Sequence, residues 1–326
     1  MSQVKSVVTA IAMLGVVALS ATACASSGSP GGSGGDDVIT VGFAQTGSES
    51  GWRSANTESI KEAFSAENGF DLIFNAADNK PEAQIAAVRS FINQGVDAIV
   101  LAPIVSDGWD DVLKEAKDAG IPVILEDRTV SAPDDLYASW IGLDFEQEGK
   151  TAGEWVAENF GSKPTNLVIL EGTTGSSAAT DRQTGFDAAV AGTDITVLDS
   201  QTGNFTRAEG KTVMEGFLQK FGSEINVLFA HNDDMGLGAL DAIKAAGMTP
   251  GTDIQIVTID AVKDGMTALA NGEFNFIVEC NPLLGEKTAE VVKSVVAGES
   301  VDKTYIVEDQ SFTQEQAKEV LDSRPY

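Results

Sequence analysis

The run Val38-Ile39-Thr40-Val41-Gly42-Phe43-Ala44, followed after two residues by Gly47-Ser48-Glu49-Ser50-Gly51-Trp52-Arg53, is the most informative stretch of the chain. The first run is largely apolar, which predicts a buried strand. The spacing of apolar residues from Ser54 to Asn68 predicts a helix, so the polar stretch between them is predicted to be a loop. A loop at the carboxyl end of a first strand is where ligands bind in an open α/β sheet.

Trp52 and Arg53 are unusual residues for a loop that only reverses the chain. Tryptophan offers a flat apolar face, and arginine offers a planar fork of hydrogen-bond donors. Together they suit a polar molecule that has apolar C–H faces and many hydroxyl groups. The loop therefore favours a sugar as the ligand.

Composition and charge narrow the classes of protein that need to be considered. The chain has 326 residues, of which 43% are hydrophobic, so it can build a large core and is long enough for two domains. Its net charge of −28 argues against nucleic acid as a partner, since a phosphate-binding surface needs clustered Lys and Arg. With a single histidine, His231, the chain holds no His-rich metal site, and we expect neither a metal nor a cofactor.

Residues 1–24 are typical of a signal sequence for export. Lys5 supplies a positive charge, and the apolar segment 7–19 is too short for a stable membrane anchor. The end of the segment, Ala21-Thr22-Ala23-Cys24, resembles a bacterial lipobox, which predicts lipidation of Cys24 and attachment to the outer face of the cytoplasmic membrane. The alternative is an ordinary signal peptide that is cleaved after Ala23. Residues 25–37 are rich in Gly and Ser and are predicted to be a flexible linker.

From Val38 onward, short apolar runs alternate with segments of helical period, for example 81–93 and 107–119. Continuously apolar strands are covered on both faces, which predicts parallel sheets with helices on each side. About ten strands fit two doubly wound α/β lobes better than one sheet, with the seam near Leu143-Asp144. The predicted strands are 38–44, 71–76, 98–102, 122–126 and 137–143, then 167–170, 196–199, 227–230, 254–259 and 276–278.

Polar residues follow the predicted strands of both lobes, where the chain leaves the sheet. If the two edges face each other, they form a cleft rich in donors and acceptors, which suits hydroxyl groups because each hydroxyl both donates and accepts. The strand-end segments are Asp127-Arg128, Gly172–Ser177 followed by Asp181-Arg182, Gly203–Arg207, His231–Asp234, Asp260 and Glu279–Asn281.

Each strand-end segment also has an ordinary structural interpretation. Asp127-Arg128 could be a surface turn, and Arg182 a solvated charge. Ser residues in 172–177 could cap a helix, and Asn232-Asp233-Asp234 could cap the helix predicted from Met235. His231 is more often structural than a base, and Cys280 is expected to be a small buried group with no disulfide to Cys24.

The body of the chain, 38–326, resembles the periplasmic sugar-binding proteins of ABC importers, of the ribose/galactose type, and within them the galactofuranose type. The motifs that carry the resemblance are Val-Gly-Phe-Ala-Gln-Thr-Gly-Ser-Glu-Ser-Gly-Trp-Arg (41–53), Ala-Val-Arg-Ser-Phe (87–91), Gly-Val-Asp-Ala-Ile (95–99), Leu-Lys-Glu-Ala-Lys-Asp-Ala (113–119), Ile-Pro-Val (121–123), Asp-Arg (127–128), Asp-Arg-Gln-Thr-Gly-Phe (181–186), Asn-Phe-Thr-Arg (204–207) and Ala-His-Asn-Asp-Asp-Met (230–235).

The resemblance implies two Rossmann-like lobes that are joined by three hinge crossings. It places 38–143 with 282–309 in the N-terminal lobe and 144–281 with 310–326 in the C-terminal lobe. It implies sugar contacts from Asp127, Arg128, Arg182, Phe205, Asn232 and Asp260, and it implies that Glu49, Trp52 and Arg53 mark the galactofuranose type. One position departs from the pattern: Cys280 stands two residues before Pro282, where ribose binders have Gln. We therefore leave Glu279, Cys280 and Asn281 out of the predicted site.

The resemblance implies a monomeric, non-enzymatic receptor that closes on a monosaccharide and delivers it to an ABC permease. Galactofuranose is favoured, with arabinose, galactose and ribose as alternatives. A sugar sensor for a signalling receptor would use the same pocket. A DNA-binding repressor is disfavoured by the charge and by the leader sequence, and a sugar-active enzyme would need a carboxylate pair such as Glu49 and Asp127, for which no reaction motif is found.

Overall fold

A computed structural model describes residues 38–326 of the chain. The predicted signal sequence, Cys24 and the linker 25–37 lie outside the described residues. Within 38–326, no helix is both long enough and apolar enough to cross a membrane.

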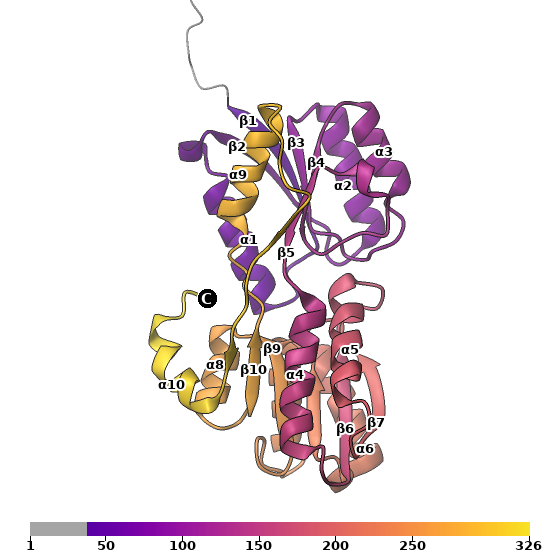
Figure 1. Cartoon of the computed structure of the whole chain (residues 1–326), viewed down its shortest axis with the longest axis vertical. Helices are drawn as coiled ribbons and strands as arrows, with labels where there is room; N and C mark the ends of the chain where they lie inside the picture. Colours follow the sequence, from indigo (N-terminus) through magenta and orange to yellow (C-terminus); the bar gives the residue numbers. More distant parts are fainter. Residues whose placement is uncertain (1–37) are drawn as a thin grey trace, which may run out of the picture. The chain divides into compact units, whose positions relative to one another are not determined.

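The first lobe is built on a six-stranded parallel sheet in the order β11-β5-β4-β3-β1-β2 (Figure 1). Its strands are β1 (Ile39–Gln45), β2 (Phe70–Ala76), β3 (Ala98–Leu101), β4 (Val123–Asp127), β5 (Ser139–Gly142) and β11 (Thr304–Ile306). The helices of this lobe are α1 (Gly51–Ala63), α2 (Pro81–Gln94), α3 (Asp110–Asp118) and α9 (Gly285–Val296), with the short turns η1 (Ala66–Asn68) and η2 (Asp134–Leu136).

The second lobe repeats this architecture around a sheet in the order β12-β10-β9-β8-β6-β7. Its strands are β6 (Thr165–Glu171), β7 (Ile195–Thr202), β8 (Val227–Ala230), β9 (Gln255–Asp260), β10 (Phe276–Glu279) and β12 (Ser311–Phe312), of which β12 pairs antiparallel with β10. Its helices are α4 (Phe145–Phe160), α5 (Ser177–Val190), α6 (Arg207–Phe221), α7 (Asp233–Ala245), α8 (Lys263–Ala270) and α10 (Gln314–Val320), with η3 (Gly222–Glu224) and η4 (Leu321–Ser323).

The central strands confirm the prediction of parallel sheets that are covered on both faces. Every residue of β3, β4, β8 and β10 is buried. A strand that is covered on both sides has no polar face, which is why these segments have continuous apolar runs instead of alternating ones.

The chain passes between the two sheets three times within the described residues. It crosses between β5 and α4, between β10 and α9, and between β11 and β12 (Figure 1). The fold class predicted from the sequence, two doubly wound lobes with three crossings, is therefore confirmed. The residue at which each lobe begins and ends stays a prediction.

Several predicted elements differ from those of the structure. The segment 47–53 is not a loop throughout, because α1 begins at Gly51 and so includes Trp52 and Arg53. Ser50 explains the early start: its backbone is extended and its hydroxyl accepts a hydrogen bond from the Arg53 amide at 3.1 Å, which is a helix N-cap. In the same way α7 begins at Asp233, not at Met235, because Asn232 is its N-cap.

The strands β11 and β12 are absent from the sequence-based prediction. They have three and two residues, and the residues of β11 are largely exposed, so neither contains the continuous apolar run by which the other strands were found. Both lie in the third crossing and become strands only by pairing with β5 and β10 at the sheet edges.

Candidate functional site

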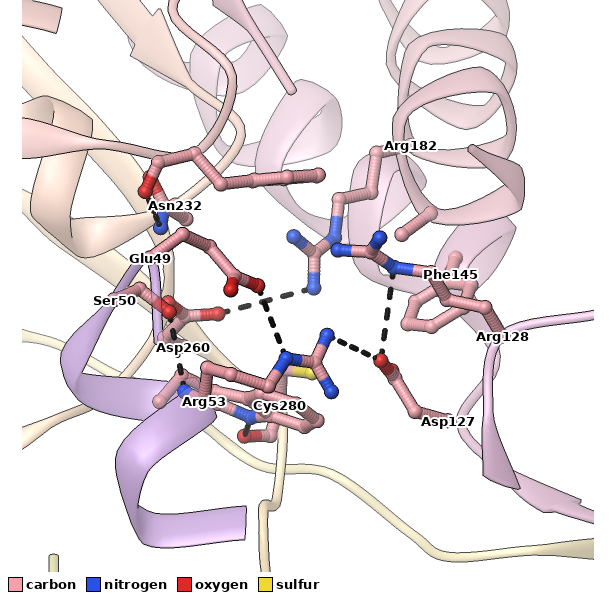
Figure 2. A pocket seen from close by; sticks show the side chains of 13 residues that line it. Glu49, Ser50, Arg53, Asp127, Arg128, Phe145, Arg182, Asn232, Asp260 and Cys280 are labelled. Atoms are coloured by element: carbon pink, nitrogen blue, oxygen red, sulfur yellow. Dashed lines mark hydrogen bonds and ion pairs between the residues drawn. The ribbon is translucent and has the colours of Figure 1, made fainter. Parts of the chain in front are cut away.

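All nine residues of the predicted sugar site line one cavity between the lobes. Figure 2 shows the guanidinium groups of Arg53, Arg128 and Arg182 directed toward one another from different elements, with carboxylates between them. The lining residues are Glu49, Ser50, Trp52, Arg53, Asp127 and Arg128 from the first lobe, with Phe145, Ala178, Arg182, Phe205, Asn232, Asp260 and Cys280.

Arg53 is the centre of the charge cluster in the first lobe. Its Nε donates to Glu49 Oε1 at 3.0 Å and its Nη2 to Asp127 Oδ2 at 2.6 Å, while the residue is only 1% exposed (Figure 2). Burial by itself would lower the pKa of Arg53, but the carboxylates of Asp127 and Glu49 outweigh it and raise that pKa above its ordinary value. Arg53 is thus a fixed cation that holds two carboxylates in place.

Arg128 is less completely paired than Arg53. Its Nη1 donates to the Ile104 carbonyl at 3.2 Å, whereas its Nε lies 3.6 Å from Asp127 Oδ2 and is buried without a hydrogen-bond partner. Burial lowers the pKa of Arg128 and the nearby Arg53 cation lowers it further. A buried N–H without a partner costs free energy, so a ligand oxygen at this point would be stabilising.

Arg182 joins α5 to three other segments of the second lobe. Its Nε donates to Glu148 Oε2 at 2.7 Å, its Nη1 donates to the His231 carbonyl, and its Nη2 lies 3.9 Å from Asp260 Oδ1. The other oxygen of Asp260, Oδ2, is buried without a partner. Burial raises the pKa of Asp260 well above its ordinary value, although Arg182 opposes the shift.

Aromatic rings cover two sides of the cavity. The Trp52 ring is held by a hydrogen bond of 2.6 Å from its Nε1 to the Cys280 carbonyl, which ties α1 to the second crossing. The Phe205 ring lies 5.0 Å from the Arg128 guanidinium, and the Phe145 ring lies 5.2 Å from that of Arg182. A flat polar ring that enters the cavity would therefore meet apolar faces and charged edges together.

Three of the lining residues have backbone conformations that residues other than glycine seldom adopt. The φ angles of Asp127, Phe205 and Asp260 are 63°, 62° and 129°. Such conformations cost about 1–3 kcal/mol each and persist only where the surroundings hold them. Strain at the last residues of two strands and in one loop, all of which reach one cavity, points to a site whose geometry is fixed in advance.

Asn232 has the capping role that the sequence left open as an alternative. Its Oδ1 accepts from the Met235 amide at 3.0 Å and its Nδ2 donates to the Phe205 carbonyl at 3.1 Å. The amide therefore begins α7 and also fixes the strained loop that carries Phe205. A direct contact between Asn232 and a sugar stays a prediction.

Direct hydrogen bonds join the two lobes around the cavity. The Gly51 amide donates to Asp234 Oδ2 at 2.7 Å, the Ser106 amide to the Gly175 carbonyl at 2.8 Å, and the Thr129 amide to Ser177 Oγ at 3.0 Å. These bonds form only when the lobes are close together. The structure is therefore the closed arrangement.

Sequence reasoning missed Ser50, Phe145, Ala178 and Cys280 in the lining, and it missed Glu148, which holds Arg182. Phe145 and Glu148 lie on α4, directly after the first crossing, and the search for polar residues at strand ends does not extend to a helix there. Cys280 was left out because it departs from the pattern of ribose binders. The Ser at position 50, three residues before Arg53, was a usable N-cap signal.

His231 is a buried structural residue and not an exposed base. Its Nδ1 accepts from the Gly172 amide at 3.3 Å, which leaves Nε2 to donate to Gln183 Oε1 at 3.2 Å. Burial and the nearby Arg182 cation lower the pKa of His231 from 6.5 to about 3. The imidazole is therefore neutral in the folded protein at pH values where it is charged in the unfolded chain.

Replacing His231 by Gln is expected to flatten the pH dependence of stability on the acid side. Between about pH 3 and 6.5 the unfolded chain binds a proton on His231 that the folded protein does not bind, so the free energy of unfolding rises with pH by up to about 1.4 kcal/mol per unit. Urea denaturation at several pH values measures this slope. Because the chain has one histidine, the difference in slope between wild type and variant isolates this residue, and identical slopes would contradict the expectation.

Comparison with known proteins shows the family of the chain. The periplasmic binding protein domain family matches residues 41–300. The galactofuranose-binding protein YtfQ of Escherichia coli is 43% identical over 88% of this chain and 91% of its own length. A crystal structure from Mycobacterium smegmatis in complex with β-D-fucofuranose is 54% identical, with a TM-score of 0.86 over 88% of this chain and 95% of that one.

A further solved structure has the same arrangement of lobes. The periplasmic binding protein of the arabinose ABC transporter from Shewanella sp. ANA-3, bound to α- and β-L-arabinofuranose, is 43% identical with a TM-score of 0.84, over 88% of this chain and 96% of that one. The matches extend over both lobes and span nearly the whole length of the relatives. The chain belongs to the periplasmic binding protein family, among the sugar-binding proteins of ABC importers that its motifs resemble.

Proposed function

We propose that this protein captures a monosaccharide in its furanose form, with galactofuranose favoured, in the cavity between the lobes. The observation that carries the proposal is that a buried unpaired donor, Arg128 Nε, and a buried unpaired acceptor, Asp260 Oδ2, belong to residues that line one cavity. Three aromatic rings, Trp52, Phe145 and Phe205, line the same cavity. A ligand with hydroxyl groups would satisfy both atoms.

The kind of sugar is inferred from the relatives and from the first lobe. The solved structures named above hold fucofuranose and arabinofuranose, and the E. coli relative is a galactofuranose-binding protein. In this chain Arg53 is already neutralised by Glu49 and Asp127, so these three side chains present a rigid polar wall next to the Trp52 ring. A compact neutral sugar fits such a wall better than an anion would, because no positive charge is left uncompensated.

We propose the following roles for the nine predicted residues. Arg53, Arg128 and Arg182 donate to ring and hydroxyl oxygens, Asp127, Asp260 and Glu49 accept from hydroxyl groups, and Asn232 can do either. Trp52 and Phe205 cover the apolar faces of the sugar. Since contacts come from both lobes, the ligand binds the closed form better than the open one and shifts the equilibrium toward closure.

We further propose that the closed, monomeric protein delivers its sugar to an ABC permease and is held at the membrane surface by lipidation of Cys24. Family membership supports delivery, and the Ala-Thr-Ala-Cys sequence before a Gly/Ser linker supports anchoring. A tether of this composition lets the sugar-binding body move while it stays near the membrane. Cys24 and the linker lie outside the described residues.

Titration of the protein with galactofuranose, arabinofuranose, galactose and ribose tests the proposal. We expect saturable binding of a furanose with a Kd of about 1 μM or lower. Trp52→Phe removes the hydrogen bond to the Cys280 carbonyl and part of the apolar face, so affinity is expected to fall about tenfold. Calorimetry provides the measurement, since tryptophan fluorescence loses its reporter in this variant.

Trp155→Phe is the matched control, because Trp155 packs against Phe276 and does not line the cavity. Its sugar affinity is expected to equal that of the wild type. Binding of a pyranose alone would keep the receptor function and overturn the preference for furanoses. A folded protein that binds no sugar at all would overturn the proposed function.

A further inference from the structure

Asp260 occupies a turn that is strained at two successive residues. The φ angles of Asp260 and Ala261 are 129° and 64°, and neither residue is glycine. The turn directs the Asp260 carboxylate into the cavity, where its Oδ2 has no partner. A strained turn that aims a ligand-facing group needs bonds from its surroundings to keep it in place.

Three of the hydrogen bonds that hold this turn come from different parts of the chain. The Cys280 amide donates to the Asp260 carbonyl at 3.2 Å, and the Val262 amide donates to Asp233 Oδ2 at 2.9 Å. The third comes from a distant part of the sequence: Arg324 Nη2 donates to the Ala261 carbonyl at 2.9 Å. Arg324 is the one charged donor of the three, and hydrogen bonds from charged donors are the stronger ones.

Arg324 is itself fixed by Glu279, at the end of β10 where the second crossing begins. Its Nη1 lies 2.6 Å from Glu279 Oε1, and the two side chains are 9% and 4% exposed. Glu279 Oε1 also accepts from the Tyr326 hydroxyl at 2.7 Å, and its Oε2 accepts from the Gln310 amide at 3.1 Å. The carboxylate therefore joins the segment 324–326 to both the second and the third crossing.

The segment 324–326 reaches this position from η4, which follows α10 (Figure 1). The Arg324 guanidinium lies 5.2 Å from the Phe312 ring and 4.4 Å from the Tyr326 ring. Its planar fork can serve the Glu279 carboxylate and the Ala261 carbonyl at the same time, which a lysine ammonium on a flexible chain cannot do with the same geometry.

We propose that Arg324 is a positioning residue of the sugar site: clamped by Glu279 and Tyr326, it holds the Ala261 carbonyl and so keeps the Asp260 carboxylate directed at the ligand. This inference rests on the proposed function. Arg324 does not line the cavity, so its effect on affinity passes through Asp260. The same contacts place Glu279, which the sequence left without a role, behind the site and not in it.

The test is a double-mutant cycle on sugar affinity. Arg324→Gln is expected to raise the Kd for the bound furanose about tenfold, part of what the Asp260 contact contributes. In an Asp260→Ala background, whose own affinity is already reduced, Arg324→Gln is expected to change Kd by less than about twofold, because the side chain that it positions is gone. An equal effect in both backgrounds, or none in the wild type, would overturn the inference.

Further variants distinguish positioning from general stability. Lys244→Gln removes another ion pair of the second lobe, with Glu273, that touches no lining residue, and is expected to leave Kd unchanged. Tyr326→Phe removes only the hydroxyl that contacts Glu279 and is expected to raise Kd about threefold. If Arg324→Gln does not fold, Tyr326→Phe replaces it in the double-mutant cycle. An unchanged Kd in Tyr326→Phe would then overturn the inference.

The outcome for the wild type separates this inference from the function on which it rests. A wild-type protein that binds no sugar overturns the proposed function, and the positioning role falls with it. A wild-type protein that binds a furanose, with an Arg324→Gln variant that binds it equally well, overturns the positioning role alone.

Discussion

Replacing Arg182 by methionine is expected to destabilise the protein by about 3–5 kcal/mol and to abolish measurable sugar binding. Glu148 is 1% exposed and its Oε2 receives the Arg182 Nε at 2.7 Å. Without the guanidinium, the Glu148 carboxyl, whose pKa is already raised by burial, would remain buried with no cation beside it, and the His231 carbonyl would lose its donor as well. Methionine is close to arginine in length and flexibility, so little of the loss would come from an empty cavity.

A second substitution separates the two effects of Arg182→Met. The double variant Arg182→Met with Glu148→Met replaces the whole buried ion pair by apolar side chains, which is often neutral for stability. It is expected to regain most of the free energy of unfolding while still failing to bind sugar, because the donor beside Asp260 is gone.

Urea denaturation and calorimetry with the furanose measure the two quantities. Arg89→Met is the control, since Arg89 pairs with Glu115 on an exposed surface and is expected to behave like the wild type. A double variant that is no more stable than Arg182→Met would contradict the assignment of the loss to the unpaired Glu148 carboxylate.

Replacing Arg53 by methionine in the first lobe is expected to lower the free energy of unfolding by a similar amount, about 3–5 kcal/mol at neutral pH. Arg53 holds Glu49 and Asp127, with the buried Glu126 carboxyl close by. Burial and the neighbouring Asp127 already raise the pKa of Glu126 to about 8, against the effect of Arg53. Without the cation, three acidic groups would share one buried region.

The loss of stability in Arg53→Met is expected to be smaller at acid pH than at neutral pH. Burial would raise the pKa of Glu49, but Arg53 and Arg128 outweigh it and hold the pKa below its ordinary value of 4.5. The stability that this pairing contributes is therefore present above about pH 4.5 and is lost as pH falls through the lower folded-state pKa. Arg53→Met removes this contribution. The difference in the free energy of unfolding between wild type and variant is therefore expected to be largest near pH 7 and to shrink in acid.

Urea denaturation between about pH 7 and pH 3.5 follows this difference. Lys61→Met is a matched control from the same helix, because its ion pair with Glu58 is exposed. A destabilisation by Arg53→Met that stays constant over the whole pH range would show that the loss comes from packing and not from charge pairing.

Residues at the ends of parallel strands could be located from the sequence because strands and helices alternate regularly along the chain, so the end of each apolar run marks an edge of a sheet. Asp127 closes β4 and Asp260 closes β9, and both side chains lie in the cavity between the lobes. An apolar run that ends in a charged residue identifies such a position without any knowledge of the three-dimensional contacts. That all nine predicted residues bind a sugar stays a prediction.

Other features could not be predicted because they depend on contacts between segments far apart in the sequence. The sequence around Glu148 gives no sign that Arg182 lies against it, because the two residues belong to different helices. Arg324 and Glu279 lie far apart in the sequence and meet only because the chain returns to the second lobe. Asn232 lines the cavity, but only its surroundings reveal that its side-chain amide is occupied by the α7 cap and the Phe205 carbonyl.

The pairing of Arg53 and Arg182 with their own carboxylates also sets how the cavity responds to the surrounding medium. Each guanidinium has its counter-ion inside the protein, at 2.6 Å for Asp127 and 2.7 Å for Glu148, so neither needs a dissolved anion when the cavity is empty. Binding a neutral sugar then releases no salt ions, and mobile ions screen such buried pairs far less than exposed ones. Capture should proceed equally well in dilute and in saline surroundings.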